Sequence, residues 1–138
     1  MPRTIKIERI IDANFNRAKE GLRVCEEITR FILENRSLTK KLKDARHEIS
    51  GLMMKFPGSR NLLQQRESSS DIGREISAGD LKRKSCKDIF SANIQRVKES
   101  LRVLEEFTKL KDINLAIEFK KLRYRVYEIE KLSANFHK

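Results

Sequence analysis

The chain has 138 residues, and its 31 Lys and Arg against 20 Asp and Glu give a formal net charge of +11. The length fits a single domain, and five Gly and two Pro are too few for the frequent turns of a sheet protein. No apolar run approaches the roughly 18 residues of a membrane span, and no secretory segment follows Met1. We therefore expect a helical protein of the cytoplasm with no membrane partner.

Apolar or small residues recur at alternating three- and four-residue spacing in four stretches, which predicts four amphipathic helices. In chain order these stretches cover residues 15–32, 38–56, 90–108 and 115–132. Each stripe is too short for an extended coiled coil, so the four helices should bury their apolar faces against one another. The predicted fold is an all-α four-helix bundle.

Local signals predict where these helices begin and end. Ser37 is the expected N-cap of the second helix, and Pro57 should stop that helix. Ser85 and Asp88 resemble a capping box in front of the third helix. Asp112 is expected to cap the fourth helix.

The two halves of the chain repeat each other. Residues 11–31 align without gaps on residues 90–110, an offset of 90 − 11 = 79, and eleven of the 21 positions are identical. The second helices match more weakly, with Ala45-Arg46-His47 opposite Leu122-Arg123-Tyr124. Self-similarity over a whole supersecondary unit indicates a duplication.

The duplication predicts how the single domain of residues 1–138 is organised. One helical hairpin should cover about residues 5–56 and its repeat about residues 85–135, related by pseudo-twofold symmetry. A long central loop, about residues 57–84, should join them. Loops of this length inside a compact domain are typically functional or disordered.

Eight of the eleven identities are polar, which a hydrophobic core does not explain. On a helical projection, a polar edge runs beside the apolar stripe of the first helix and repeats in the third. Its members in the two repeats are Asn14, Arg17 and Glu20, then Asn93, Arg96 and Glu99. Glu27 lies next to this edge, whereas Glu26 falls on the opposite face, which we expect to be solvated.

Two interpretations of this polar edge stay open. In the structural one, Arg17 bonds a carboxylate of a neighbouring helix, Asn14 bonds the long loop, and Arg23 with Glu27 forms an ordinary i,i+4 pair. In the functional one, the two edges flank a polar cleft in which Arg17 and Arg96 grip an anion bidentately.

The functional interpretation gives further residues a role around that cleft. Carboxylates would orient a base edge or a metal ion: Glu20, Glu27 and Glu99. The central loop would close the cleft, with Arg66 adding positive charge and Asp71 offering a hard oxygen ligand for Mg²⁺.

Other chemistry finds no support in the residues. The two Cys and two His have no close zinc-ligand spacing, so no zinc site is expected. There is no P-loop and no dinucleotide fingerprint, and no Ser or Cys has a His at a motif-like spacing. We expect neither a haem nor a nicotinamide cofactor.

The same segments resemble a bacterial family of helical domains that is often fused in front of thiamine-phosphate synthase. The resemblance lies in Arg9–Val24, in Arg66 with Asp71-Ile72-Gly73, and in residues 92–106, and it extends from about residue 7 to about residue 132. We expect no synthase barrel within these 138 residues, which could not hold one, so the domain either stands alone or belongs to a longer chain.

The resembled family is understood as an alternative hydroxymethylpyrimidine phosphate kinase of thiamine biosynthesis. The resemblance therefore implies phosphoryl transfer to that pyrimidine, with ATP and Mg²⁺ as cofactors. The acceptor monoester has a second pKa of about 6, so it is already a dianion at neutral pH. The chemistry then needs charge neutralisation and alignment more than a strong base.

For this reaction the sequence offers catalytic candidates and substrate-binding candidates. The expected catalytic residues are Arg17, Arg96 and Asp71, with Asp71 also the Mg²⁺ ligand. The expected substrate-binding residues are Asn14, Glu20, Glu27, Arg66, Asn93, Glu99 and Arg123. Expected partners are a small phosphorylated pyrimidine, a nucleotide, a second copy in a homodimer, and a thiamine-phosphate synthase.

Two alternative functions remain. A basic helical bundle with a pI near 9.9 suits nucleic acid, although the basic and acidic residues are interspersed and stacking aromatics are scarce. A helical interaction module that docks a thiamine-pathway enzyme is the other alternative.

Overall fold

The structure, a computed structural model, describes residues 3–59, 71–74 and 82–135. Its regular elements are all helical: α1 (Arg3–Glu27), the π-helix η1 (Ile28–Ile32), α2 (Arg36–Lys55), α3 (Cys86–Thr108) and α4 (Ile113–Leu132). The all-α prediction is confirmed. None of these described helices is long and apolar enough to cross a membrane.

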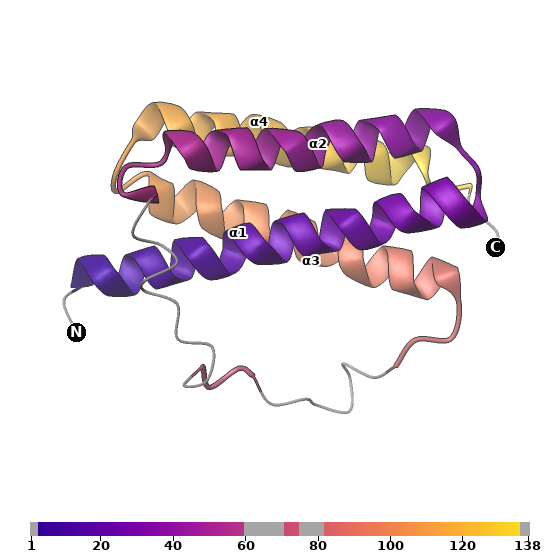
Figure 1. Cartoon of the computed structure of the whole chain (residues 1–138), viewed down its shortest axis with the longest axis horizontal. Helices are drawn as coiled ribbons and strands as arrows, with labels where there is room; N and C mark the ends of the chain where they lie inside the picture. Colours follow the sequence, from indigo (N-terminus) through magenta and orange to yellow (C-terminus); the bar gives the residue numbers. More distant parts are fainter. Residues whose placement is uncertain (1–2, 60–70, 75–81, 136–138) are drawn as a thin grey trace.

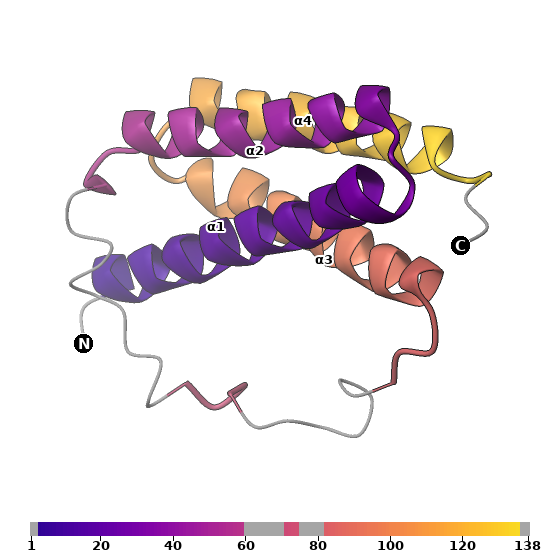
Figure 2. The same ribbon diagram turned by 45° about the vertical axis from the view of Figure 1, so that its right-hand side comes forward.

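The four helices pack as two layers, with α2 and α4 in one and α1 and α3 in the other (Figure 1). Hairpin 1 consists of α1, η1 and α2, and hairpin 2 consists of α3 and α4. Each helix packs on its hairpin partner and on one helix of the other hairpin, through α1 with α3 and α2 with α4. The helices α1 and α3 run antiparallel and cross each other (Figure 2).

The predicted apolar stripes form the core of this bundle. One leucine from each helix is fully buried: Leu22, Leu42, Leu101 and Leu122. Only the last residues of two stripes escape burial, since Ile32 is 44% exposed and Leu132 is 56% exposed. Burial of these stripes removes apolar surface from water and supplies the main driving force for the fold.

The crossing of α1 over α3 depends on Gly21. A Cβ atom at this position would lie 2.7 Å from Cγ2 of Val97 and 3.0 Å from the carbonyl oxygen of Asn93. No ordinary side chain fits such a gap, so the glycine permits the two backbones to approach. The first half of α3 is thereby placed against the last third of α1.

Two of the predicted helix caps are confirmed. The Ser85 hydroxyl accepts the N–H of Asp88 at 3.1 Å, and the Asp88 carboxylate accepts the N–H of Lys84 at 3.1 Å. The carboxylate of Asp112 accepts the N–H of Leu115 at 3.1 Å. These bonds satisfy N–H groups that have no partner within the helix.

The predicted cap of the second helix was wrong by two residues. Asn35, not Ser37, caps α2, because its side chain accepts the N–H of Leu38 at 3.0 Å. Both residue types are good caps, so local preference did not separate them. The chain stays non-helical at Asn35, with φ −95° and ψ 102°, and Ser37 already lies inside α2.

The turn inside hairpin 1 explains why the offset between the two repeats changes after their first helices. The first helices of the hairpins are offset by 79 residues, but the caps Asn35 and Asp112 are offset by 112 − 35 = 77. Hairpin 1 therefore carries two more residues in its turn. They are accommodated in η1, where the Leu33 N–H bonds the Ile28 carbonyl at 3.0 Å, and at Glu34, whose φ is +51°.

Each hairpin is held by a buried ion pair at equivalent positions. In hairpin 1, Arg46 donates from Nε and Nη2 to the two carboxylate oxygens of Glu26, at 3.0 and 3.4 Å. In hairpin 2, Arg123 donates from the same two nitrogens to Oε2 of Glu105, at 3.1 and 3.0 Å. The expectation that Glu26 is solvated was wrong, since this residue is only 3% exposed.

Candidate functional site

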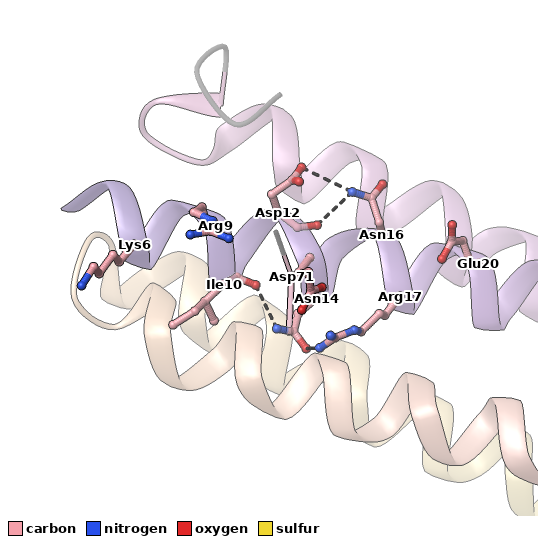
Figure 3. Close-up of a pocket in the computed structure, with 10 residues that line it drawn as sticks. Lys6, Arg9, Ile10, Asp12, Asn14, Asn16, Arg17, Glu20 and Asp71 are labelled. Atoms are coloured by element: carbon pink, nitrogen blue, oxygen red, sulfur yellow. Dashed lines mark hydrogen bonds between the residues drawn. The ribbon is translucent and has the colours of Figure 1, made fainter. Parts of the chain in front are cut away.

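A polar cleft of about 610 Å³ runs along the outer edge of α1 (Figure 3). Its charged and amide side chains come from α1 and from one residue of the central loop: Lys6, Arg9, Asp12, Asn14, Asn16, Arg17, Glu20 and Asp71. Steps of three and four residues join Lys6, Ile10, Asn14, Arg17 and Glu20 along one side of α1. From Lys6 to Glu20 this side extends about 21 Å at 1.5 Å per residue.

Asn14 is the buried anchor of the cleft. It is 5% exposed, and its Nδ2 donates to the carbonyl oxygen of Ile10 at 2.9 Å. Its Oδ1 accepts a hydrogen bond from Nη1 of Arg17 at 3.5 Å. Asn14 thus bonds its own helix rather than the loop, and its amide oxygen helps to orient the guanidinium of Arg17.

Arg17 is exposed in the cleft, and no carboxylate of the described residues lies within ion-pair distance of it. The structural interpretation, in which Arg17 bonds a carboxylate of a neighbouring helix, therefore finds no support there. An exposed guanidinium keeps most of its donors available, and its planar fork suits a phosphate oxygen pair. Glu20 lies one turn further along the same edge.

Sequence reasoning missed several lining residues in the first half of α1. Lys6 and Arg9 add cations to the cleft, and Asp12 and Asn16 add polar groups. Nδ2 of Asn16 donates to the carbonyl oxygen of Asp12 at 2.9 Å and to its carboxylate at 3.3 Å. Helical spacing could have found Lys6 and Arg9. Both fall on the same edge as Arg17 once α1 is extended back to its actual start.

Asp71 brings the central loop to the cleft. Its Oδ1 accepts the N–H of Gly73 at 2.8 Å, and its carbonyl oxygen accepts the N–H of Arg74 at 3.2 Å, so the segment forms a tight turn. No group of three or more His, Cys, Asp or Glu in the described residues could hold a metal ion. Mg²⁺ commonly uses one or two carboxylates plus substrate phosphates and water, and Asp71 fits that requirement.

The equivalent edge of α3 has the same anchor but a different surface. Nδ2 of Asn93 donates to the carbonyl oxygen of Ile89 at 2.8 Å, as Asn14 does to Ile10. However, the residues that correspond to Lys6 and Arg9 are Ser85 and Asp88. Both of these are engaged in capping α3.

The expected cleft between the two edges gives way to a cleft on α1, because no residue of α3 lines it. Asn93 crosses α1 at Gly21, about 10 Å along the helix axis from Asn14 at 1.5 Å per residue. Arg96 is exposed, and Glu99 accepts a hydrogen bond from Nε2 of Gln95 at 3.0 Å. The structure therefore does not bring the α3 candidates to the α1 cleft.

The remaining site predictions lie elsewhere. Glu27 forms the predicted i,i+4 pair with Arg23, at 3.1 Å, and is about 20 Å from Asn14 along α1. Arg123 is 7% exposed and bonds Glu105 and the Tyr127 hydroxyl, so its guanidinium has a structural role. Arg66 lies outside the described residues.

The buried thiol of Cys25 takes no part in the cleft. Burial raises its pKa to about 12, and its Sγ lies 3.7 Å from the carbonyl oxygen of Phe90. The thiol therefore stays protonated near neutral pH and is a poor nucleophile.

Comparison with known proteins places the chain in a family. Residues 9–132 match the ThiD2 family, which is nearly the whole described bundle. The chain belongs to the ThiD2 family. No solved structure matches it.

Members of this family occur within longer proteins. The chain is 42% identical over 125 residues to a thiamine-phosphate synthase of Synechocystis sp., covering 90% of this chain and 35% of that protein. It is 40% identical over 125 residues to the thiamine-phosphate synthase of Nostoc punctiforme, covering 90% and 34%. The corresponding protein of Rhodopirellula baltica is 38% identical over 120 residues, covering 86% and 32%. The chain thus spans about a third of the length of these relatives.

Proposed function

We propose that this chain transfers a phosphoryl group from ATP to hydroxymethylpyrimidine phosphate in thiamine biosynthesis, with Mg²⁺ present. The observation that carries the proposal is the cleft on α1, where the exposed Arg17 and the carboxylate of Asp71 line one cavity. Membership of the ThiD2 family and similarity to thiamine-phosphate synthases support the same pathway.

The charges of the cleft suit a reaction between two anions. The acceptor is a dianion near neutral pH, and the triphosphate of the donor is more strongly charged. Lys6, Arg9 and Arg17 place three cations along one side of α1, beside the carboxylates of Asp12, Glu20 and Asp71. Contacts between these cations and phosphate oxygens would reduce the repulsion between the two substrates. We assign Arg17 to the transferred phosphoryl group, because its fork is oriented by Asn14 and remains exposed.

Asp71 and Glu20 receive separate roles. Asp71 would hold Mg²⁺ together with phosphate oxygens of the donor, and the ion would supply charge neutralisation across those phosphates. Glu20 is exposed at the other end of the cleft, where its carboxylate can accept hydrogen bonds from the amino group of an aminopyrimidine. The reaction is thereby assigned to the α1 edge alone, without Arg96.

A thiamine-phosphate synthase is the proposed partner. The similar proteins named for that activity are about three times as long as the matched segment, so the two units share one chain there. A kinase that makes a pyrimidine diphosphate and a synthase that consumes it would benefit from a high effective concentration of one near the other.

The test is a turnover assay with purified chain, ATP, Mg²⁺ and hydroxymethylpyrimidine phosphate, in which the diphosphate is measured by chromatography. Asp71→Asn should lower kcat about 100-fold and raise the Mg²⁺ concentration needed for half-maximal rate. The control is Asp44→Asn, since this exposed carboxylate bonds Lys40 on α2 and does not line the cleft. Absence of the diphosphate from the wild-type reaction would overturn the proposal.

A further inference from the structure

The turn of hairpin 1 lies at the end of the bundle opposite the start of α1 (Figure 1). Residues of this turn and of the first half of α2 line a second cleft. It has a volume of about 430 Å³, and four of its lining residues are cations: Arg30, Arg36, Lys40 and Lys43. Glu34 is the single carboxylate of the lining. We propose that this basic cleft binds a small molecule that carries a di- or triphosphate group. The proposal does not depend on the phosphoryl transfer assigned to the α1 cleft.

The cations of the basic cleft are concentrated by the local fold. Arg36, Lys40 and Lys43 follow one another at spacings of four and three residues, so they share one side of α2 over about 10 Å. The π-helix η1 brings Arg30 to the same cavity. Lys40 bonds Asp44 at 2.9 Å, but no carboxylate of the described residues forms an ion pair with Arg36 or Lys43.

Comparison with hairpin 2 shows that the bundle does not need the charges of Arg36 and Lys40. At the offset of 77, Arg36 and Lys40 correspond to Ile113 and Ile117, which are 68% and 45% exposed. Arg30 corresponds to Lys109, whose ammonium bonds Glu106 at 2.9 Å. Lys43 likewise corresponds to Lys120, so two of the four cations have a basic counterpart in hairpin 2. Arg36 and Lys40 are the two positions that are basic in hairpin 1 and apolar in hairpin 2. Folding does not explain this difference, whereas an anionic ligand does.

The size of the basic cleft favours a small polyphosphate over a nucleic acid. Cations spread over about 10 Å of α2 match the length of a di- or triphosphate, and several donors converge on one cavity. A groove that follows a nucleic-acid backbone needs a longer basic track and stacking aromatics. Here the carboxylate of Glu34 lies in the lining and Asp44 lies beside Lys40, so the positive surface is short.

The basic cleft is a separate site from the cleft on α1. Glu20 is the last α1 residue that lines the α1 cleft, and Arg30 follows it by ten residues. Ten residues of helix extend about 15 Å along the helix axis. A triphosphate is too short to occupy both clefts. A ligand bound here would therefore lie outside the α1 cleft.

The experiment is a titration of the folded chain with sodium tripolyphosphate, followed by amide NMR and by calorimetry. It is made in the Arg17→Ala background, so that binding in the α1 cleft is weakened. The amides of residues 34–43 should shift, and Arg36→Gln with Lys43→Gln should weaken the affinity at least tenfold. The control is Lys120→Gln, because Lys120 is the hairpin 2 residue that corresponds to Lys43. The affinity of this variant for tripolyphosphate should stay within twofold of that of the Arg17→Ala protein.

Three results would overturn the proposal. One is the absence of shifts in residues 34–43 at millimolar tripolyphosphate. Another is a loss of affinity in Lys120→Gln equal to that in the Arg36→Gln, Lys43→Gln variant, which would mean that tripolyphosphate is attracted by the overall charge of the protein. The third is a preference of these residues for a DNA or RNA duplex over tripolyphosphate at physiological salt. Turnover of the pyrimidine substrate is measured separately, so a failure of one proposal leaves the other intact.

Discussion

Hairpin 1 and hairpin 2 share an internal framework but differ on the surface. In both, an asparagine bonds the carbonyl four residues earlier and a buried glutamate bonds an arginine of the partner helix. Both also have an i,i+4 Arg–Glu pair on the first helix, at 3.1 and 3.2 Å. Hairpin 1 lines the basic cleft and, together with Asp71 of the central loop, the α1 cleft, whereas no residue of hairpin 2 lines either cleft. Duplication therefore preserved what folding requires in both copies.

The comparison separates the repeated polar residues into two groups. Those with partners inside their own hairpin, such as Asn14 and Glu26, are explained by folding. Arg17, Glu20 and Arg96 are exposed, and none of them forms an ion pair with a described residue. The one hydrogen bond of Arg17 is to Asn14 on the same edge. Of these three residues, Arg17 and Glu20 line the α1 cleft.

The largest expected difference concerns the two buried ion pairs. Arg123→Met should lower the free energy of unfolding by about 3–5 kcal/mol, because it leaves the carboxylate of Glu105 buried without a partner. Arg46→Met should cost less, since the side chain of Arg46 is 18% exposed against 8% for Arg123, and water can reach Glu26 more easily. Urea unfolding followed by circular dichroism measures both. Equal losses would show that exposure does not separate the pairs.

The next difference concerns the two edges. Arg17→Ala should lower kcat/KM for phosphoryl transfer about 100-fold, which corresponds to about 2.7 kcal/mol of transition-state stabilisation. Arg96→Ala, at the equivalent position of α3, should lower it less than threefold, because Arg96 does not line the cleft. Initial rates at varied substrate concentration test both variants. A comparable loss in Arg96→Ala would restore the expectation that both edges act in one site.

The smallest difference concerns a pair of buried threonines. The Thr29 hydroxyl donates to the Glu26 carbonyl at 3.0 Å and lies 2.9 Å from the Thr39 hydroxyl. The equivalent Thr108 hydroxyl has no hydrogen-bond partner among the described residues. Thr29→Val should therefore destabilise the protein by about 1–2 kcal/mol, whereas Thr108→Val should be neutral or stabilising by up to about 1 kcal/mol.

Thermal unfolding of the two valine variants at one pH gives the sign of each change. Thr39→Val provides a further check, because it removes the partner of Thr29 without altering Thr108. A loss of stability in Thr108→Val as large as that in Thr29→Val would mean that the Thr108 hydroxyl is satisfied in solution.

Most of the fold follows from local patterns in the sequence, and the site follows only in part. Apolar spacing predicted the four helices because each must bury one side, and the caps at Ser85 and Asp112 are decided by neighbouring residues. The same reasoning placed Glu26 in solvent. It failed because a long carboxylate at the border of the apolar stripe reaches Arg46 on the partner helix.

The candidate site shows the same division. Helical spacing alone grouped Asn14, Arg17 and Glu20, and Asp71 of the central loop, which was expected at the cleft, lines it with them. The grouping with Arg96 assumed that duplicated edges face each other. The antiparallel crossing at Gly21 instead sets the two edges apart along the α1–α3 pair.

By itself, the sequence determined the helical class, the duplication and the polar edge, because these depend on periodicities of a few residues. Only the tertiary structure decided which copy of the edge lines a cleft. The reason is that a cleft needs groups from segments distant in sequence, and their meeting depends on how helices cross and where a loop is held. The charged residues behind the net charge of +11 are likewise divided by the fold among ion pairs, solvated faces, the α1 cleft and the basic cleft.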